Sequence, residues 1–442
     1  MNLNPLSNER YSVVGGTGNW NDPNSWAYRS GGTPGAPAPT AINLVFIEGG
    51  DVIVMNDNPG YCRELIIGTT TGGSLSFTQN FRDLNVGNGG LAINANGDII
   101  GTTTGNDIFL NGDAIINKVI SHTSLTLNMQ ATGGQISGNG GVPAVEIDDS
   151  TTNTGSLVVA NNVNVNGGSL TNDGTLNIGL ALSFQASDLT FTNNGTLTVG
   201  DDLAFTQDRC IVNNNGSINV TDDITAGFGD NDNIITNTAG NTFTVGNDIN
   251  INNADLVINN YGVFNLNGSF LNGEIDSGSN FYNFSGATWN YGGASFDAST
   301  QIYCNYDANS FIYYAAGNQD IIIPQDAYWH VTFTNSGTKE TQGDLTVNGD
   351  LTISGTAVLD VSINNNDISL LGDWSNTSTF NEGTQTVSFE GNALQTISNL
   401  AGETFYNLTI NNSGAGIILG NGDAIVTNLL LMTQGNINVN SN

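Results

Sequence analysis

A short phrase of turn, strand, turn and strand recurs through the middle of the chain, and this repeat constrains the fold more than any other feature. Its clearest copies are TGSLVVANNVNV from Thr154, NDGTLNIGLALSF from Asn172, NNGTLTVGDDLAF from Asn193, NNGSINVTDDITA from Asn214, AGNTFTVGNDINI from Ala239 and NYGVFNLNGSFLN from Asn260. The leading glycines recur at similar but unequal intervals and are Gly155, Gly174, Gly195, Gly216, Gly240 and Gly262. We expect each repeat to form one coil of a solenoid.

Apolar and polar residues alternate within each copy, which is the period of a β-strand with one buried face. Stacked coils about 4.8 Å apart bury a continuous apolar column and pair the backbone groups of neighbouring coils. The usual chirality of parallel crossovers makes the stack right-handed. The sequence therefore predicts an all-β protein, a right-handed parallel β-solenoid, with Leu197, Ile218 and Phe243 in one interior column.

Weaker copies extend the repeat in both directions. A unit that begins at Gln319 is echoed by one that begins at Gln395, and Asn335-Ser336-Gly337 of the first unit recurs in the second as Asn412-Ser413-Gly414. We expect an N-terminal cap or entry module over residues 1–66, regular coils over 67–310, and longer units over 311–442 that continue in a larger natural chain.

Composition supports the repeat. The chain has 57 glycines, 8 prolines and only 11 % charged residues, and Asn, Thr and Asp fill many of the other positions. These residues are weak in helix interiors and suit turns between short strands, so almost no helix is expected.

Charge restricts the partners. Seven basic residues stand against 40 acidic ones, for a formal net charge of -33. Polyanion binding needs clustered cations, so nucleic acid and anionic lipid surfaces are improbable partners. Such acidity fits an extracellular or cell-surface protein, where divalent cations are plentiful.

The cysteines and the apolar runs do not indicate a disulfide-rich, zinc-binding or membrane-spanning protein. Cys62, Cys210 and Cys304 are far apart and odd in number, so we expect buried fillers rather than disulfides or a zinc site. No apolar run approaches the ~20 residues of a membrane span, so no membrane insertion is expected. The start MNLNPLSNER lacks the apolar core of a signal peptide, so if the protein is exported we expect this sequence to be a mature or excised segment.

The downstream units resemble a repeat of very large secreted surface and adhesin-like proteins of the Bacteroidota. The shared features are Gln-x-Ile, a Tyr-x-x-Leu-Thr-like strand and Asn-x-Ser-Gly, over roughly residues 310–440. The segment with Trp20 and Trp26 looks like the entry module of such proteins, although Asn43 stands where an Asp is usual. The resemblance implies export by type IX secretion and a role in adhesion or gliding.

Acidic corners are the first candidate site. They fall at matching positions of three successive coils and comprise Asp201, Asp202, Asp222, Asp223 and Asp248. Stacked carboxylates repel one another, which favours a weak calcium site; Asp is equally a common turn residue. Both interpretations stay open.

Aromatic residues concentrate between Phe281 and Trp329. Phe281, Trp289 and Phe311 are in the inward phase and are expected to pack in the core. Tyr282 and Tyr314 are in the outward phase, which makes them candidate glycan-binding residues.

Catalytic patterns known from other parallel β-helices are missing from the sequence. Between Lys118 and Lys339 the only basic residue is Arg209, and His122 and His330 are isolated from any nucleophile motif. We therefore expect no enzyme and no catalytic residues. The predicted function is a structural or adhesive segment of a surface stalk, fibre or filament that attaches to a glycan or protein ligand and can associate end to end. The alternative is a carbohydrate-binding or polysaccharide-degrading β-helix module.

Overall fold

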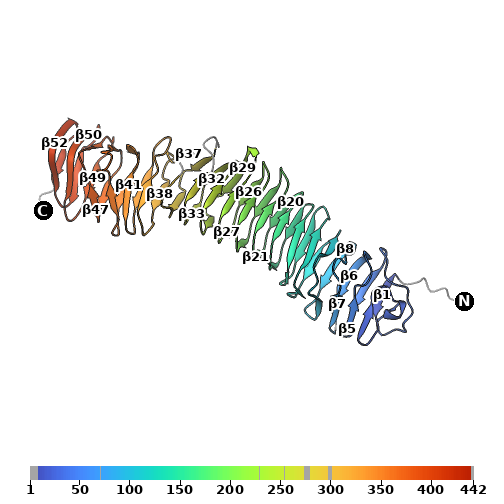
Figure 1. The fold of residues 1–442 in the computed structure, drawn as a ribbon. Coiled ribbons are helices and arrows are strands. Elements are labelled where there is room, and N and C mark those ends of the chain that lie inside the picture. Colours follow the sequence, from blue (N-terminus) through green and yellow to red (C-terminus); the bar gives the residue numbers. More distant parts are fainter. Residues whose placement is uncertain are drawn as a thin grey trace. The chain divides into compact units, whose positions relative to one another are not determined.

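The protein is a β-solenoid of about 18 turns in which parallel sheets run through nearly all of the chain (Figure 1). The computed structural model describes residues 8–69, 71–227, 229–252, 254–272, 279–296 and 301–439. They form two compact units, Met1–Val220 and Thr221–Asn442. Within the described part, the only helical element is the short 3-10 turn η1, Pro23–Ser25. The prediction of a parallel β-solenoid with almost no helix is confirmed.

The first coils of the first unit lie on two sheets. The first sheet contains β1 Glu9–Ser12, β3 Trp26–Ala27, β4 Leu44–Ile47, β6 Gly60–Ile67, β8 Leu84–Ile93, β10 Asn106–Leu110, β11 Ala114–Ile116 and β13 Leu125–Met129. The second contains β2 Thr17–Asn19, β5 Asp51–Val54, β7 Gly73–Phe77, β9 Gly97–Gly101 and β12 Ser121–His122. Strand β1 is antiparallel to β3 and parallel to β4, so the solenoid pairing begins at the first described strand.

The later coils of the first unit have three short strands each. One stack contains β16 Ala144–Ile147, β19 Val163–Val165, β22 Leu182–Phe184 and β25 Leu203–Phe205. The next contains β14 Gly134–Ser137, β17 Thr151–Asn153, β20 Ser169–Asn172, β23 Thr190–Asn193 and β26 Ile211–Asn214. The third contains β15 Gly141–Val142, β18 Ser156–Val159, β21 Thr175–Ile178, β24 Thr196–Val199 and β27 Ser217–Val220.

Register keeps equivalent residues above one another. Leu176 pairs with Leu197, and Leu197 pairs with Ile218. All three are buried, whereas Thr196 is exposed, as the alternation predicted. Each fully buried aliphatic side chain contributes about 1.5 to 3 kcal/mol, so the stacked column supplies much of the driving force for folding.

A buried ladder of asparagine amides connects the coils of the first unit. The Nδ2 atoms of Asn153, Asn172 and Asn193 each donate to the Oδ1 atom of the next asparagine, at 2.7, 2.8 and 3.0 Å, and the last acceptor is Asn214. Each amide also donates to a backbone carbonyl one coil further on. Because every amide hydrogen has an acceptor, the ladder satisfies polar groups that would otherwise destabilise the core.

The second unit begins with coils of the same kind. One stack contains β28 Ile224–Ala226, β31 Ile249–Ile251 and β34 Phe270–Asn272, and another contains β29 Gly229–Asn237, β32 Ala254–Asn260, β35 Asn280–Asn283 and β37 Gln301–Tyr303. The third stack continues to the end of the unit and contains β30 Thr242–Val245, β33 Val263–Leu266, β36 Thr288–Tyr291, β38 Ser310–Tyr313, β40 His330–Phe333, β43 Leu351–Ile353, β46 Trp374–Asn376, β49 Gln395–Ser398, β51 Ile417–Asn421 and β53 Ile437–Val439.

Two further stacks complete the later coils of the second unit. They contain β39 Gln319–Ile321, β41 Thr338–Thr341, β44 Val358–Asp360 and β47 Thr379–Asn381, and β42 Leu345–Val347, β45 Ile368–Leu370, β48 Thr386–Phe389, β50 Glu403–Asn411 and β52 Ala424–Gln434.

The core of the second unit is rich in aromatic residues. Phe243, Phe264, Trp289 and Phe311 follow one another in register, with ring centroids 4.9 to 5.9 Å apart. All four are buried, and so is Phe281. The inward placement predicted for Phe281, Trp289 and Phe311 is confirmed.

The two related units in the C-terminal part place their leading glutamines in the same environment. The Nε2 atom of Gln319 donates to the carbonyls of Tyr291 and Gly293, and that of Gln395 donates to those of Leu370 and Gly372. Both side chains are buried. The repeated Gln-x-Ile therefore marks a side chain that connects two coils.

Candidate functional site

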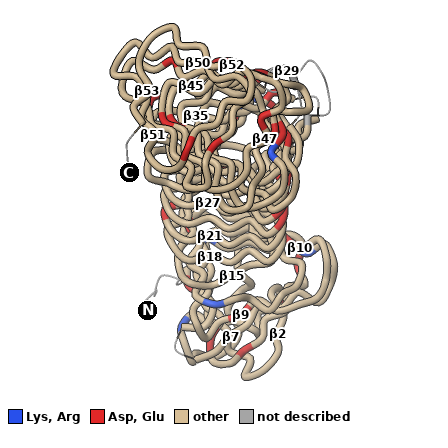
Figure 2. The backbone as a smooth tube through the Cα atoms, turned by 90° about the vertical axis from the view of Figure 1, so that its left-hand side faces the viewer, with Lys and Arg blue, Asp and Glu red and all other residues tan. Residues whose placement is uncertain are grey.

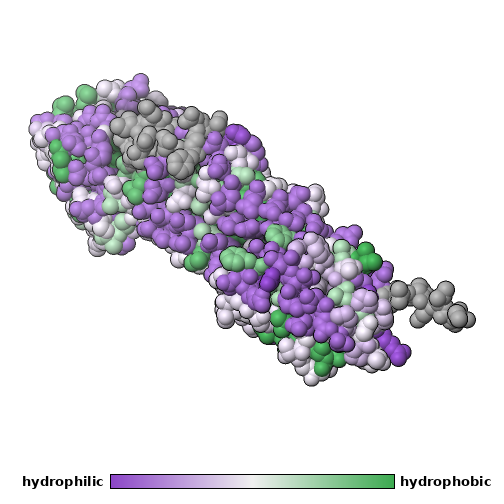
Figure 3. Space-filling model, turned by 45° about the vertical axis from the view of Figure 1, so that its right-hand side comes forward, coloured by the Kyte–Doolittle hydropathy of each residue, from purple (hydrophilic) through white to green (hydrophobic). Residues whose placement is uncertain are grey.

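Charged side chains of the protein are mostly acidic, and basic ones are rare along the chain (Figure 2). The face drawn in Figure 3 is largely hydrophilic, with separate hydrophobic patches. Against this surface, three groups of residues are candidates for function: the acidic corners, the outward aromatic residues and the few cations.

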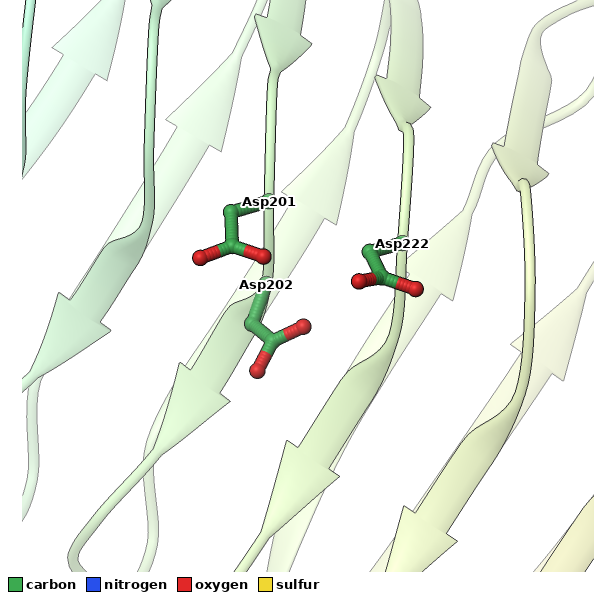
Figure 4. Close-up of side chains that lie close together, drawn as sticks. All are labelled: Asp201, Asp202 and Asp222. Carbon is green, nitrogen blue, oxygen red and sulfur yellow. The ribbon is translucent and has the colours of Figure 1, made fainter.

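The acidic corners lie on the turns between strands. Asp201 and Asp202 follow β24 in the first unit, and Asp222 follows β27 at the start of the second unit (Figure 4). Asp223 stands next to Asp222, and Asp248 lies on the turn between β30 and β31. All five therefore occupy turns, as expected.

Carboxylates of these turns accept backbone N–H groups of the neighbouring coil. An oxygen of Asp223 accepts from the amide of Asp248 at 2.8 Å and from the side chain of Asn247 at 2.9 Å. Asp248 accepts in turn from the amide of Ser269 at 2.6 Å. Burial raises the pKa of Asp223, and the charges of Asp222 and Asp248 raise it further.

The same bond recurs in later coils of the second unit. Asp350 accepts from the amide of Asp373 at 2.8 Å, and Asp373 accepts from that of Thr396 at 2.7 Å. An aspartate at this corner thus joins successive coils through a backbone amide. The corners also supply oxygen ligands of the type that calcium prefers, so a calcium site and a plain turn role remain the two alternative interpretations.

Outward aromatic residues gather on one face of the second unit. The outer aromatic row comprises Tyr261, Tyr282, Phe284, Tyr303 and Tyr306. The rings of Tyr261 and Phe284 stack with centroids 4.3 Å apart, and those of Tyr282 and Tyr303 with centroids 4.8 Å apart. Phe284 also contacts the ring of Tyr306 at 4.8 Å and that of Tyr282 at 5.7 Å. The five rings therefore form one continuous surface.

Ring stacking decides which atoms of the row can meet a ligand. Phe284 has Tyr261 on one side and Tyr306 on the other, so its faces are largely occupied by neighbouring rings. Tyr261 is 41 % exposed, and Tyr282, Tyr303 and Tyr306 are partly exposed. A ligand would meet ring edges, hydroxyl groups and the outermost ring faces.

Carboxylates flank the outer aromatic row. Burial raises the pKa of Tyr282, and so do the neighbouring Tyr303 and Asp232. Burial also raises the pKa of Tyr306, with Asp326 as the next cause. Negative charge beside the rings disfavours anionic ligands and suits neutral polyhydroxylated or cationic ones.

The structure separates the two tyrosines proposed for glycan binding. Tyr282 belongs to the outer aromatic row on β35. Tyr314 follows β38 on a different sheet, is half-buried, and its hydroxyl donates to Asn267. The aromatic concentration from Phe281 to Trp329 includes Phe284, Tyr303 and Tyr306, but the sequence singled out only Tyr282 of the row as outward, and Tyr261 lies outside that concentration.

Arg209 and the two histidines each make a hydrogen bond within the solenoid. Arg209 forms two bonds of 2.6 Å with Asp188, and the Nδ1 atom of His330 accepts from the amide of Asp350 at 3.0 Å. His122 is buried, and its Nδ1 atom accepts from the amide of Ser124 at 3.1 Å. The Cys62, Cys210 and Cys304 thiols are buried, as expected for fillers, and burial raises their pKa values.

Lys339 and Glu403 are buried charged groups of the second unit, and each has several hydrogen-bond partners. The Nζ atom of Lys339 donates to the carbonyls of Ala315 and Gly317 and to Gln319 Oε1 at 2.6 to 3.1 Å. Burial lowers the pKa of Lys339 to about 8. The carboxylate of Glu403 accepts from Trp374, Asn376 and Asn399, and burial raises its pKa. Both groups hold coils together from within.

A surface hollow of about 420 Å³ lies in the first unit, near β1 and β5. Glu48 and Asp51 line it together with Ser12, Ser30 and Thr71. The two oxygens of Asp51 accept from the amides of Val14 and Gly15, so this carboxylate orders the wall of the hollow.

Fold and site together define a parallel β-solenoid repeat protein whose polar side chains connect successive coils. Comparison with protein-family models, with curated proteins and with solved structures gave no match. Among the described residues, no helix is long and apolar enough to cross a membrane.

Proposed function

We propose that the protein is an extracellular structural and adhesive surface protein, in which the solenoid forms part of a stalk or fibre and holds a binding surface outward. The carrying observation is the outer aromatic row, in which five rings that are at least partly exposed contact one another. Exposed aromatic clusters of this kind mark binding sites more often than isolated aromatic residues do.

The use of the polar groups supports a scaffold rather than a catalyst. The buried side chains of Asn172, Gln319, Lys339 and Glu403 each bond to a neighbouring coil. Side chains held in this way stabilise the stack, and their hydrogen-bonding capacity is already used. The proposed role is therefore non-catalytic.

A neutral glycan is the ligand class that the row suits best. The outermost ring faces pack against sugar C–H groups, the tyrosine hydroxyls bond to sugar O–H groups, and the nearby Asp232 is an acceptor for further hydroxyls. Carbohydrate binding is thus the specific form of adhesion that we favour. Export by a type IX route, and an origin in Bacteroidota, are proposals that rest on the resemblance of residues 310–440.

Retention on immobilised polysaccharides tests the proposal. The purified chain should be retarded in affinity electrophoresis on at least one neutral polysaccharide among cellulose derivatives, soluble chitin derivatives and mannan, and not on pectin or alginate. Tyr303→Ala and Tyr282→Ala should reduce retention several-fold, because each removes one ring of a stacked pair.

Tyr61→Ala is the matched control, since Tyr61 is 46 % exposed but lies in the first unit, outside the row. It should leave retention unchanged. Equal loss in the control and the row variants, or no retention on any neutral polysaccharide, would overturn the proposed role of the row.

A further inference from the structure

Carboxylates lie on the coil before the outer aromatic row and on the coil after it. The row extends over β32, β35 and β37 and the corners that follow them, and these strands pair in this order. Asp232 belongs to β29, which pairs with β32 from the preceding coil, and its side chain is exposed. Asp326 belongs to the coil that follows β37 and is also exposed. Each end of the row along the stack therefore has an acidic side chain.

Three backbone amides hold Asp326 in place beside the row. Its Oδ1 atom accepts from the amide of Cys304 at 2.9 Å and from the amide of the next residue at 2.8 Å, and its Oδ2 atom accepts from the amide of Asn305 at 3.1 Å. Cys304 and Asn305 connect Tyr303 to Tyr306, so the carboxylate is fixed next to two rings of the row. Because a carboxylate has about four lone-pair sites, one site on Oδ2 remains for a ligand.

The charges of the two carboxylates reach the hydroxyl groups of the row. Burial is the largest cause of the raised pKa of Tyr306, and the charge of Asp326 is the next. Burial also comes first for Tyr282, followed by Tyr303 and Asp232. A negative potential over exposed tyrosine rings attracts a cation to them.

The second unit contains no basic side chain that could supply this cation. Lys339 is the only Lys or Arg between residues 221 and 442. Its Nζ atom is buried and donates to three oxygen atoms of the interior. The positive charge that suits the row must therefore come from a ligand.

The separation of the two carboxylates along the stack sets the size of that ligand. From Asp232 to Asp326 the chain passes four coil steps, three between the paired strands β29, β32, β35 and β37 and one to the coil of Asp326. At the usual spacing of neighbouring strands, this length is about 19 Å. A small amine or a single sugar reaches one end of the row, whereas an oligosaccharide that lies along the stack reaches both.

We propose that the outer aromatic row binds an amino-sugar chain, whose rings lie along the tyrosines and whose protonated amino groups lie beside Asp326 and Asp232. This ligand class rests on the proposed glycan binding and makes it more specific. The sugar rings are neutral where they meet the row, and the charge is confined to the ammonium groups. A basic peptide carries similar charge but lacks the hydroxyl groups that pair with the tyrosine hydroxyls, so the glycan fits the row better.

Two oligosaccharides that differ only in their amino groups provide the test. Oligomers of glucosamine and of N-acetylglucosamine, of equal length and linkage, are titrated into the full chain by calorimetry, in a mildly acidic buffer that keeps glucosamine protonated. At low ionic strength the glucosamine oligomer should bind roughly fivefold to tenfold more tightly. The two affinities should become equal near ~1 M salt, because the Debye length there is only ~3 Å.

Asp326→Asn should reduce this preference to roughly twofold, since the amide oxygen still accepts from the backbone but carries no charge. Binding of the N-acetylglucosamine oligomer should be unchanged. Asp344→Asn is the matched control, because Asp344 is an exposed carboxylate of the same unit that also accepts a backbone amide, that of Asp367 at 2.9 Å. It removes the same charge outside the row and should keep the full preference.

The outcomes separate the amino-sugar ligand from glycan binding as such. Equal affinities for the two oligomers, or an equal loss of preference in Asp326→Asn and Asp344→Asn, would overturn the amino-sugar ligand and leave a neutral glycan in place. No binding of the glucosamine oligomer would also overturn it, and retention on neutral polysaccharides then decides the proposed function separately. A lysine oligomer of equal charge that binds as tightly would show that charge alone is recognised, which contradicts the proposal.

Discussion

The glycine at the corner between two strands of each repeat is required by the close approach of neighbouring coils. A Cβ atom added at Gly195 would overlap the carbonyl oxygen of Gly174 in the preceding coil, and Gly174 stands in the same way above Gly155. The constraint is the close approach of two backbones rather than an unusual backbone conformation.

Gly195→Ala should therefore destabilise the protein by about 1 to 3 kcal/mol, because the coils must move apart to admit a methyl group. Gly16→Ala is the control, since no heavy atom lies within 4 Å of a Cβ at Gly16. Chemical denaturation of both variants measures the difference. Equal stabilities would show that the coils are not packed this closely.

The lowered pKa of Lys339 predicts that the free energy of unfolding depends on pH. Its pKa is about 8 in the folded protein against an ordinary value of 10.5, so between these two values the unfolded chain binds more protons than the folded one. Stability must then rise with pH across this window, by roughly 1 to 2 kcal/mol once screening by solvent is allowed for. Urea unfolding at a series of pH values is the measurement.

Lys339→Met provides the reference for that experiment. The variant loses the donor for Ala315, Gly317 and Gln319 and should be less stable at every pH, but without the rise. Other titrating groups act equally in both proteins. Parallel pH profiles for the two would contradict the lowered pKa of Lys339.

At the scale of strands and turns, the sequence predicted well which strand side chains are buried. It predicted poorly which side chains of successive coils contact one another. The alternation in TLTV and SINV predicted which side chains are buried, because period two follows directly from strand geometry. The asparagine ladder was missed, although an Asn two positions before Gly174, Gly195 and Gly216 was a visible signal. A side chain that bonds to its own equivalent in the next coil is recognised only when the register is known.

The outer aromatic row illustrates the same limit. Tyr282 was placed outward from its phase in the strand. Its neighbour Tyr303 lies on the next coil, and Phe284 directly follows the same strand. Tyr261 directly follows β32, in a corner whose length differs between coils. Unequal coil lengths, visible in the uneven intervals between the leading glycines, hide such alignments.

The asparagine ladder yields the prediction at this scale. Asn193→Ala removes one donor and one acceptor from a buried chain of bonds and leaves the amide of Asn172 without its side-chain acceptor. We expect a loss on the order of 3 kcal/mol. The neighbouring Asn194 is exposed and donates to Asp173, so Asn194→Ala should cost under about 1 kcal/mol. Similar losses would argue against the ladder.

Turn aspartates predict the response to calcium. Since Asp223 and Asp248 already accept backbone amides, about 10 mM calcium chloride should leave the melting temperature equal to that in magnesium chloride of the same ionic strength. A calcium-specific rise that Asp223→Asn abolishes would instead show a bound ion.

At the scale of the molecule, hydrogen bonds between polar side chains of successive coils add to the stability of the fold. In a globular enzyme a larger hydrophobic core supplies that stability. A solenoid coil has only a narrow interior, so ladders of amides and carboxylates supplement its apolar column. The sequence predicted this architecture because the repeat is local. It did not predict the apolar outward face of β52. That face is recognised only by comparison with the polar outward residues that precede it in register on earlier coils.

Incubation with polysaccharides tests the central claim, that this solenoid is a binding scaffold and performs no chemistry. The chain should be retained on a neutral polysaccharide while reducing ends and the absorbance of unsaturated sugars stay at the level of the buffer. Release of either kind of sugar end by the purified protein would contradict the account.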